Sequence, residues 1–307
     1  MPEAAKTLAS RRVLVTGAAG FIGSRLCSRL LEAGTEVHGV SRRRHEADGV
    51  HWWKADLAEY PAADHVMAEV RPDVVFHLAG EVSGVRDVAM IRPTVRNTLL
   101  STVNLLTSAC WLGSPRMILA GSASEPGPDG VPASPYAAAK AASSMYARTF
   151  HACYGLPVTN LRLSMVYGPG QEDYDKLIPY VTRSLLRGDV PRLSSGVHEF
   201  DWVYVDDVLG AFISAAAAAD LAGHTLDVGS GELVSVRSIV ERIGRLTGRT
   251  AQPQFGAVPD RQREDSLLAD VRRTREVLGW QAQTPLEDGL AKTVEWHRER
   301  HADVAPR

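Results

Sequence analysis

The segment VLVTGAAGFIG, residues 13–23, joins an apolar, β-branched run to three glycines, Gly17, Gly20 and Gly23. The run predicts a buried strand, and the glycines permit a tight turn into a helix that begins near Gly20. The unpaired N–H groups and positive dipole end of such a helix bind anions. The spacing is G-x-x-G-x-x-G, whereas the commonest dinucleotide fingerprint is G-x-G-x-x-G. Its place between strand and helix still predicts a site for the phosphates of a dinucleotide.

Alternation of strands and helices continues from this segment to about residue 165. Expected strands cover residues 13–16, 36–41, 50–54, 74–78, 117–120 and 158–163, and expected helices cover 21–31, 95–111 and 136–154. This order is typical of the α/β class and predicts a Rossmann-type, doubly wound parallel sheet.

The second half of the chain has shorter elements and more loop. Helices are expected at residues 177–187, 207–219, 236–246 and 286–298. We therefore predict a dinucleotide-binding Rossmann domain at residues 1–165 and a smaller C-terminal α/β substrate lobe at 166–307. The sequence leaves open whether the chain crosses back between the two.

The net charge of −2 over 307 residues gives no electrostatic reason to expect nucleic acid or an anionic membrane as a partner. No signal peptide pattern opens the chain, and no apolar run approaches the ~20 residues of a membrane span. We expect a cytoplasmic protein. The three cysteines lack metal-ligand spacing, so no metal site is expected.

The end of the second expected strand reads GVSRRR, with Ser41 followed by Arg42, Arg43 and Arg44. Many NAD-binding chains place an acidic residue here to hold the ribose hydroxyls. An arginine at this point pairs with a 2′-phosphate instead. The segment favours NADP over NAD, and a solvated basic loop is the alternative interpretation.

A second cluster consists of GSASEPG, residues 121–127, and SPYAAAK, residues 134–140. Tyr136 and Lys140 are four residues apart and share one face of a helix. A nearby cation lowers the pKa of a tyrosine from its ordinary value of about 10, which suits acid–base catalysis. Ser122 follows the strand at 117–120, at the sheet edge where ligands bind, and its hydroxyl is placed to bond a substrate oxygen.

These features resemble the extended short-chain dehydrogenase/reductase family, which contains nucleotide-sugar epimerases, dehydratases and reductases. The resemblance rests on TGAAGFIG, the Asp56-Leu57 pair, HLAG, Ser122, Tyr136 with Lys140, RLSMVYGPG, WVYVDDV and LGW. It implies hydride exchange between nicotinamide and a sugar carbon. In that reaction Tyr136 carries the proton, Lys140 holds the ribose and Ser122 polarises the oxygen. It also implies adenine contacts from Asp56 and Leu57.

Motifs and resemblance together give the expected binding residues. The cofactor-binding set is Gly17, Gly20, Phe21, Ile22, Gly23, Ser41, Arg42, Arg43, Asp56, Leu57, Leu78, Ala79, Gly80, Tyr136, Lys140 and Val166. The substrate-binding set is Ser83, Ser124, Met165, Leu177, Arg261 and Arg263. The expected partner is a nucleotide-diphosphate sugar, and the family further implies a homodimer formed through residues 95–111 and 136–154.

Several positions depart from the family pattern. The 4,6-dehydratases carry Asp-Glu directly after the catalytic Ser or Thr, whereas this chain has Ala123 and Ser124, so dehydration is set aside. Met165 replaces a common asparagine and Phe200 a common arginine, which favours a less polar sugar. Arg261 and Arg263 are candidates to replace the lost phosphate contact.

His77, in the fourth expected strand, and Asn97, in the helix that follows it, are interpreted separately. His77 lies in an apolar strand and is expected to pack in the core. The asparagine that the family carries in the following helix corresponds to Asn97 only with a register offset of one against Thr98.

The preferred interpretation is an NADPH-dependent ketoreductase of a nucleotide-activated 4-keto-6-deoxy sugar, with the proton donated by Tyr136. The alternative is an NAD-dependent nucleotide-sugar 4-epimerase, or a uronic acid sugar decarboxylase, that oxidises and re-reduces its substrate with bound NAD. A dinucleotide sensor without catalysis is disfavoured, because Ser122, Tyr136 and Lys140 are all present.

Overall fold

The structure is a computed structural model that describes residues 3–46, 49–126, 130–248, 252–260 and 268–302. Its contacts divide the chain into two compact units. Unit 1 contains residues 1–163, 209–227 and 272–280, and unit 2 contains residues 164–208, 228–271 and 281–307. The chain thus returns to unit 1 twice. The division into two domains at residues 1–165 and 166–307 stays a prediction.

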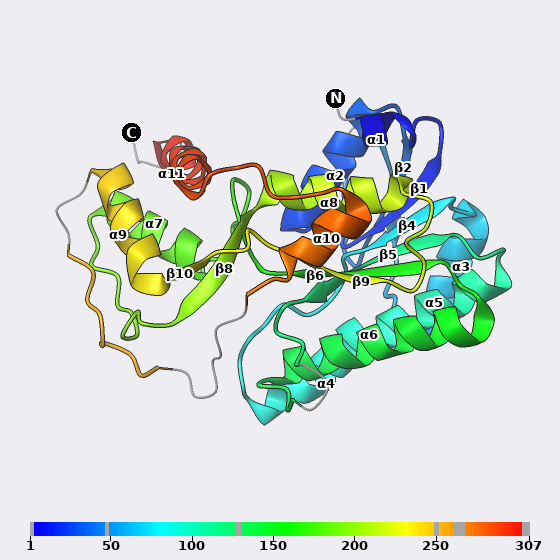
Figure 1. Ribbon diagram of the computed structural model, residues 1–307, viewed down its shortest axis with the longest axis horizontal. Coiled ribbons are helices and arrows are strands. Elements are labelled where there is room, and N and C mark those ends of the chain that lie inside the picture. The colour runs from blue at the N-terminus through cyan, green and yellow to red at the C-terminus, as the bar shows by residue number, and fades with distance from the viewer. Residues whose placement is uncertain (1–2, 47–48, 127–129, 249–251, 261–267, 303–307) are drawn as a thin grey trace. The chain divides into compact units, whose positions relative to one another are not determined.

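Seven strands form the sheet of unit 1. They are β1 (Arg12–Thr16), β2 (Glu36–Ser41), β3 (Val50–Lys54), β4 (Val74–His77), β5 (Arg116–Ser122), β6 (Val158–Leu163) and β9 (Thr225–Val228). Their order is β3-β2-β1-β4-β5-β6-β9, and the pairs from β3 to β6 are parallel (Figure 1). Because β2 and β4 flank β1, the strand order reverses at β1, and ligands of open α/β sheets bind at such points. The predicted doubly wound sheet is confirmed.

Helices cover both faces of this sheet (Figure 1). Helices α3 (Tyr60–Val70), α5 (Ser101–Trp111) and α6 (Pro135–Tyr154) lie on one face, and α2 (Phe21–Glu32) and α8 (Val205–Ala217) lie on the other. The short α1 (Glu3–Lys6) and α10 (Val271–Leu278) also fall largely in this unit. Aliphatic side chains such as Met67, Val75 and Leu105 are fully buried between the sheet and the first helix layer. Burial of this apolar surface holds the strand ends in place.

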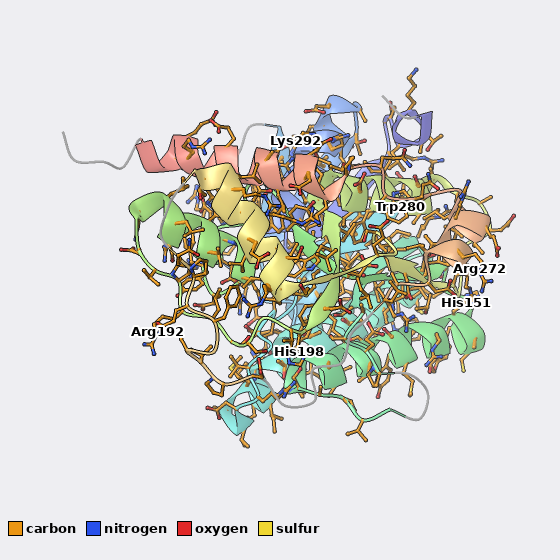
Figure 2. The ribbon with its side chains drawn as sticks, turned by 60° about the vertical axis from the view of Figure 1, so that its left-hand side comes forward. His151, Arg192, His198, Arg272, Trp280 and Lys292 are labelled. Carbon is orange, nitrogen blue, oxygen red and sulfur yellow. The ribbon has the colours of Figure 1, made fainter. Side chains whose placement is uncertain are left out.

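Both ends of α6 are fixed. At its start, the Ser134 hydroxyl accepts a hydrogen bond from the Ala137 N–H at 3.2 Å, which caps the helix. Near its end, Nδ1 of His151 (Figure 2) lies 3.0 Å from the carbonyl oxygen of Leu156. Gly223 has φ +80°, and a Cβ added there would lie 2.3 Å from Cδ2 of His151. The helix that carries Tyr136 and Lys140 therefore has a defined position against the sheet.

The predicted single helix at residues 95–111 is wrong in its first part. The structure has a 3₁₀ turn, η1 (Val88–Met90), then α4 (Ile91–Thr94), a π-helical turn η2 (Val95–Leu100), and only then α5. Hydroxyl side chains bond back to carbonyl oxygens along this stretch: Ser101 to Asn97 and Thr102 to Thr98, each at 2.7 Å. Such bonds bend helices, and wide turns of this kind are frequent at functional sites.

Unit 2 has a three-stranded sheet in the order β10-β8-β7. Strand β7 (Met165–Tyr167) is parallel to β8 (Glu199–Tyr204), and β10 (Leu233–Ser235) is antiparallel to it. Helices α7 (Leu177–Arg187), α9 (Val236–Thr247) and α11 (Leu286–Ala302) pack against one another. The predicted helices of the second half are confirmed, the one at 177–187 with the same ends and the other three with shifted ends. The strands β7 to β10 were not predicted.

Candidate active site

The glycine turn joins β1 to α2. Gly17 has φ +66°, a left-handed conformation that favours glycine, and a Cβ there would lie 2.9 Å from the backbone nitrogen of Ala79. A Cβ at Gly23 would lie 2.2 Å from the carbonyl oxygen of Gly17. Both glycines therefore allow the backbone of the turn to lie against the end of β4 and against the first turn of α2.

The start of α2 fits the pyrophosphate of a dinucleotide. Gly20 is the N-cap, and among the described residues no side chain caps it. Phe21, Ile22 and Gly23 form the first turn, which carries no acidic residue. The N–H groups of a first helical turn have no partner within the helix, and phosphate oxygens satisfy them.

The carboxyl end of β4 is held by a neutral hydrogen-bond chain. The Thr16 hydroxyl oxygen accepts the N–H groups of Leu78 and Ala79 at 3.2 and 3.1 Å and lies 2.7 Å from Nδ1 of His77. With its oxygen accepting, the hydroxyl donates to Nδ1. Nε2–H of His77 then donates to the hydroxyl of Thr102 at 2.9 Å. The bonding pattern thus assigns one tautomer to the imidazole.

His77 is a core residue, as the sequence indicates, with 4% of its surface exposed. Burial, assisted by the positive charge of Lys140, lowers the pKa of His77 to about 3. The imidazole is neutral at physiological pH. Its role is to fix the backbone N–H groups that follow β4.

The carboxyl end of β5 faces the start of α6. Nζ of Lys140 lies 5.9 Å from the ring centre of Tyr136, so the two side chains share one face of the helix, as their spacing predicts. The ammonium donates a hydrogen bond of 2.6 Å to the carbonyl oxygen of Ala120. A Cβ at Gly80 would lie 3.7 Å from Nζ of Lys140. Contacts at the ends of β1, β4 and β5 therefore connect the glycine turn to the tyrosine–lysine pair.

Ser122 ends β5 and is 8% exposed. Its hydroxyl oxygen lies 2.8 Å from that of Ser124, and its side chain hydrogen-bonds Tyr136. The predicted catalytic residues Ser122, Tyr136 and Lys140 are thus brought together in unit 1, with the predicted substrate residue Ser124 beside them.

The pKa of Tyr136 differs in direction from the sequence-based expectation. Burial raises it above the ordinary value, the hydrogen bond with Ser122 lowers it, and the negative charge of Glu125 raises it again. Burial also lowers the pKa of Lys140 to about 8, against the opposing effect of Glu125. The Lys140 ammonium is hydrogen-bonded to the carbonyl oxygen of Ala120. Desolvation of the phenol is therefore the largest contribution to the pKa of Tyr136.

Sequence analysis missed Glu125. This carboxylate is 8% exposed; Oε1 accepts the N–H of Ser122 at 2.8 Å and Oε2 accepts the hydroxyl of Ser144 at 2.6 Å. Burial raises its pKa, which the hydrogen bonds from Ser144 and Ser122 and the charges of Lys140 and Arg162 partly offset. The available signal was a lone acidic residue three positions after the predicted catalytic serine, within GSASEPG.

The adenosine side of the predicted site lies at the ends of β2 and β3. Ser41 ends β2, and its hydroxyl accepts the N–H of the exposed Arg43 at 3.2 Å. Asp56 follows β3; burial acts to raise its pKa, but the N–H of Ala58 and Arg96, 2.7 Å away, hold it below its usual range, and the charge of Arg42 adds to this. Its predicted neighbour Leu57 is buried.

The π-helical turn η2 brings two successive residues, Asn97 and Thr98, to the segment that follows β4. Thr98 is 1% exposed, and its hydroxyl accepts the N–H of Glu81 at 3.0 Å. A Cβ at Gly80 would lie 3.3 Å from that hydroxyl oxygen. Asn97 instead donates to the Glu81 carboxylate at 3.2 Å. Ser83 forms a local turn by accepting the N–H of Val85 at 3.3 Å.

The remaining predicted residues belong to unit 2 or lie outside the described residues. Met165 and Val166 belong to β7 and Leu177 begins α7, all in unit 2, where Met165 is 41% exposed. Arg261 and Arg263 lie outside the described residues. The roles of these five residues stay predictions.

The part of the chain that the structure describes contains neither a helix suited to span a membrane nor a group of side chains suited to hold a metal ion. None of its helices combines the length and the apolar character needed to cross a membrane. Its His, Cys, Asp and Glu side chains form no group of three or more that could hold a metal ion.

Comparison with known proteins identifies the class. The model of the NAD dependent epimerase/dehydratase family matches residues 13–229. The chain belongs to this family, and the resemblance to extended short-chain dehydrogenases/reductases is confirmed.

Individual relatives extend the match to nearly the whole chain. A UDP-glucose 4-epimerase from Mycolicibacterium smegmatis is 34% identical, with 94% of this chain and 99% of that protein covered. A dTDP-glucose 4,6-dehydratase from Streptomyces antibioticus is 31% identical, with 94% and 93% covered.

Solved structures are similar over the same length. UDP-glucose 4-epimerase from Thermotoga maritima, solved with UDP-glucose, has a TM-score of 0.87 at 27% identity, with 94% of this chain and 99% of that chain covered. MoeE5, solved with UDP-glucose and NAD, has a TM-score of 0.84 at 34% identity and the same coverage.

Proposed function

We propose that this protein is an NAD-dependent 4-epimerase of a UDP-hexose. The observation that carries the proposal is the 34% identity, over 94% of the chain, to a UDP-glucose 4-epimerase. The solved relatives that contain UDP-glucose support the same substrate class. These similarities support the alternative interpretation of the sequence better than the ketoreductase.

The residues at the end of β5 support epimerisation over dehydration. Ser122, Tyr136 and Lys140 form one cluster, whereas Ala123 and Ser124 replace the Asp-Glu pair that the dehydratases carry. A reaction that removes hydrogen from C4 and returns it needs one proton carrier, and Tyr136 is that group. Dehydration needs a further acid and base.

In the proposed reaction Tyr136 takes the proton of the sugar C4 hydroxyl and later returns it to the same oxygen. A dinucleotide held by the first turn of α2 would supply a nicotinamide able to exchange hydride with the sugar C4 on either face. Ser122 holds the reacting oxygen by a hydrogen bond. Lys140, whose pKa is about 8, carries its positive charge at neutral pH and offsets the cost of forming a phenolate in a buried place.

We further propose NAD, and not NADP, as the resident cofactor. Solved relatives contain NAD. Two of the three arginines after β2 have carboxylates nearby: Arg44 lies 3.6 Å from Glu46, and the charge of Arg42 acts on Asp56. These contacts support the interpretation of this segment as a solvated basic loop, and not as a binding site for a 2′-phosphate.

The test measures cofactor retention and turnover together. The purified protein is denatured, and its released dinucleotide is identified by absorbance and mass spectrometry. The native enzyme is then assayed with UDP-glucose and UDP-galactose without added cofactor. We expect retained NAD and interconversion of the two sugars. An empty cofactor site, with stoichiometric oxidation of added NADPH by a nucleotide 4-keto sugar, would restore the ketoreductase.

We also propose a homodimer formed by the helix layer of α4, η2, α5 and α6. Large apolar side chains are exposed there: Ile91, Val95, Leu100, Trp111, Met145, Tyr146 and Tyr154. Met145→Glu should convert the dimer to a monomer in sedimentation velocity, because it places a charge in an apolar contact. Val258→Glu, at an exposed apolar position of unit 2, is the matched control. A wild-type monomer at micromolar concentration contradicts the proposal.

A further inference from the structure

The buried carboxylate of Glu125 has no role in the reaction described above. Burying a charge is unfavourable unless it is paired and hydrogen-bonded. Glu125 is bonded through both oxygens, and Gly121 makes room for it, since a Cβ there would lie 2.7 Å from Oε1 and from the Asn160 amide. The chain therefore builds a specific place for this carboxylate.

The place of Glu125 connects two parts of the active site. Its Oε1 accepts the backbone N–H of Ser122, at the end of β5. Its Oε2 accepts the hydroxyl of Ser144, which also accepts from Nδ2 of Asn160 at 2.7 Å. Tyr136, Lys140 and Ser144 are successive at four-residue spacing on α6, so they form one stripe of the helix. One side chain thus links the catalytic serine to the stripe that carries the tyrosine and lysine.

We propose that Glu125 is a positioning residue of this active site, which joins Ser122 to the catalytic face of α6 and serves as the buried counter-charge of Lys140. The inference rests on the proposed function for its effect on turnover, whereas its effect on Lys140 is independent of the substrate. Glu125 touches neither substrate nor cofactor in this role. It acts through Ser122, Ser144 and Lys140.

Other charged and titratable groups surround the carboxylate. Lys140 and Tyr136 approach it from α6, and the two pKa values respond to its charge. From β6, Arg162 acts on it, but Nε of Arg162 is already paired with Asp227 of β9 at 2.6 Å. From β4, His77 is neutral and lies near Lys140. Lys140 is thus the cation whose protonation depends most directly on Glu125.

Glu125→Gln separates charge from shape. The amide keeps the size of the side chain and one acceptor oxygen, but it removes the negative charge. The five lysines of the chain are labelled with ¹³C at Cε, and the Lys140 signal is assigned by its absence in Lys140→Met. We expect the midpoint of the Lys140 titration, near pH 8 in the wild type, to fall by roughly one pH unit in Glu125→Gln.

Ser144→Ala separates the link from the charge. It removes the contact to Oε2 but leaves the carboxylate, so the Lys140 midpoint should stay within roughly 0.3 pH units of the wild type. We expect kcat to fall about fivefold with little change in KM, as one hydrogen bond of the link is lost. Ser143→Ala is the matched control, because its buried hydroxyl bonds only Ala139 of the same helix among the contacts described.

An unchanged midpoint of the Lys140 titration in Glu125→Gln would contradict the proposal that Glu125 is the counter-charge of Lys140. Equal values of kcat in Ser144→Ala and Ser143→Ala would contradict the proposal that Glu125 joins Ser122 to α6 through Ser144. If Glu125→Gln does not fold, Glu125→Asp keeps the charge but is too short to reach both partners, so it should retain the midpoint and lose turnover. A wild type that titrates as expected but lacks epimerase activity refutes the proposed function and leaves the Glu125–Lys140 coupling intact.

Discussion

The carboxyl ends of β4 and β5 are neighbours in one sheet, but they are built from opposite chemistry. At β4, Thr16, a neutral His77 and Thr102 form a chain of hydrogen bonds with one assigned direction. At β5, a buried carboxylate and a buried ammonium flank a tyrosine. The first end can hold backbone N–H groups in place at any physiological pH. The second can change its protonation, which a proton carrier requires.

Burial alone does not determine the role of a titratable side chain at these strand ends. His77 and Lys140 are both less than 10% exposed, and burial lowers both pKa values. The pKa of about 3 leaves His77 neutral throughout the working range, whereas the pKa of about 8 keeps Lys140 close to its titration point. Substitutions at the two ends should therefore affect different measurements.

The largest effect is expected at the charged end. Tyr136→Phe removes the proton carrier and should lower kcat by roughly 10²–10⁴-fold, equivalent to about 3–5 kcal/mol in the barrier, with little loss of stability. Tyr146→Phe, on the exposed side of the same helix, is the control and should retain activity. The measurement is the initial rate of epimerisation, and equal rates in the two variants would place the proton on another residue.

The next effect concerns stability at the neutral end. Because the folded protein holds the pKa of His77 at about 3, below the unfolded value of about 6.5, only the unfolded chain gains this proton between these limits. The free energy of unfolding should therefore fall by about 4 kcal/mol from this group as the pH drops through the window. Urea unfolding of His77→Gln should lack this loss, whereas the exposed control His65→Gln keeps it. Parallel curves for wild type and His77→Gln would show that His77 is protonated when folded.

A smaller effect of the same kind is expected from Lys140. Its folded pKa of about 8 lies below the ordinary value of about 10.4, so the unfolded chain holds the proton more tightly between these values. Stability of the wild type relative to Lys140→Met should rise by about 2–3 kcal/mol from pH 8 to pH 10.4. The exposed Lys54→Met serves as control: it keeps Lys140, so its stability relative to Lys140→Met should rise over the same range. A relative stability that falls over this range would contradict the lowered pKa.

The smallest effect is expected in the neutral hydrogen-bond chain of Thr16, His77 and Thr102. Thr102→Val leaves the Nε2–H of His77 without its acceptor and should cost about 1–2 kcal/mol in unfolding free energy, with kcat nearly unchanged. Thr107→Val is the matched control, because its hydroxyl bonds only the carbonyl oxygen of Val103 among the contacts described, one turn back on the same helix. Similar losses in both variants would mean that the chain through His77 contributes nothing beyond a local bond.

The sequence was sufficient for features that depend on short-range spacing. The run at residues 13–23 predicted a strand, a turn and a helix start, and all three are present. The interval between Tyr136 and Lys140 placed both on one helix face. These predictions succeed because backbone periodicity and glycine geometry act within a few residues.

Features that depend on distant partners were not predicted. Glu125 is recognisable only when Ser144, 19 positions away, lies against it. The raised pKa of Tyr136 depends on burial, which a local motif does not report. The choice between ketoreductase and epimerase depended on Met165, Phe200 and the arginines after β2, none of which the spacing of motifs could connect to a reacting atom.

The π-helical turn at η2 has a consequence for which side chains reach the end of β4. A turn of this kind contains one residue more than an ordinary helical turn, and here two successive residues reach Glu81: the Thr98 hydroxyl accepts its N–H, and Asn97 donates to its carboxylate. Because the wide turn absorbs its extra residue locally, deleting one residue within 95–100 should restore regular winding with little rotation of α4 relative to α5. Length variation at this place would then leave the flanking helices in place and still change which side chain meets the end of β4.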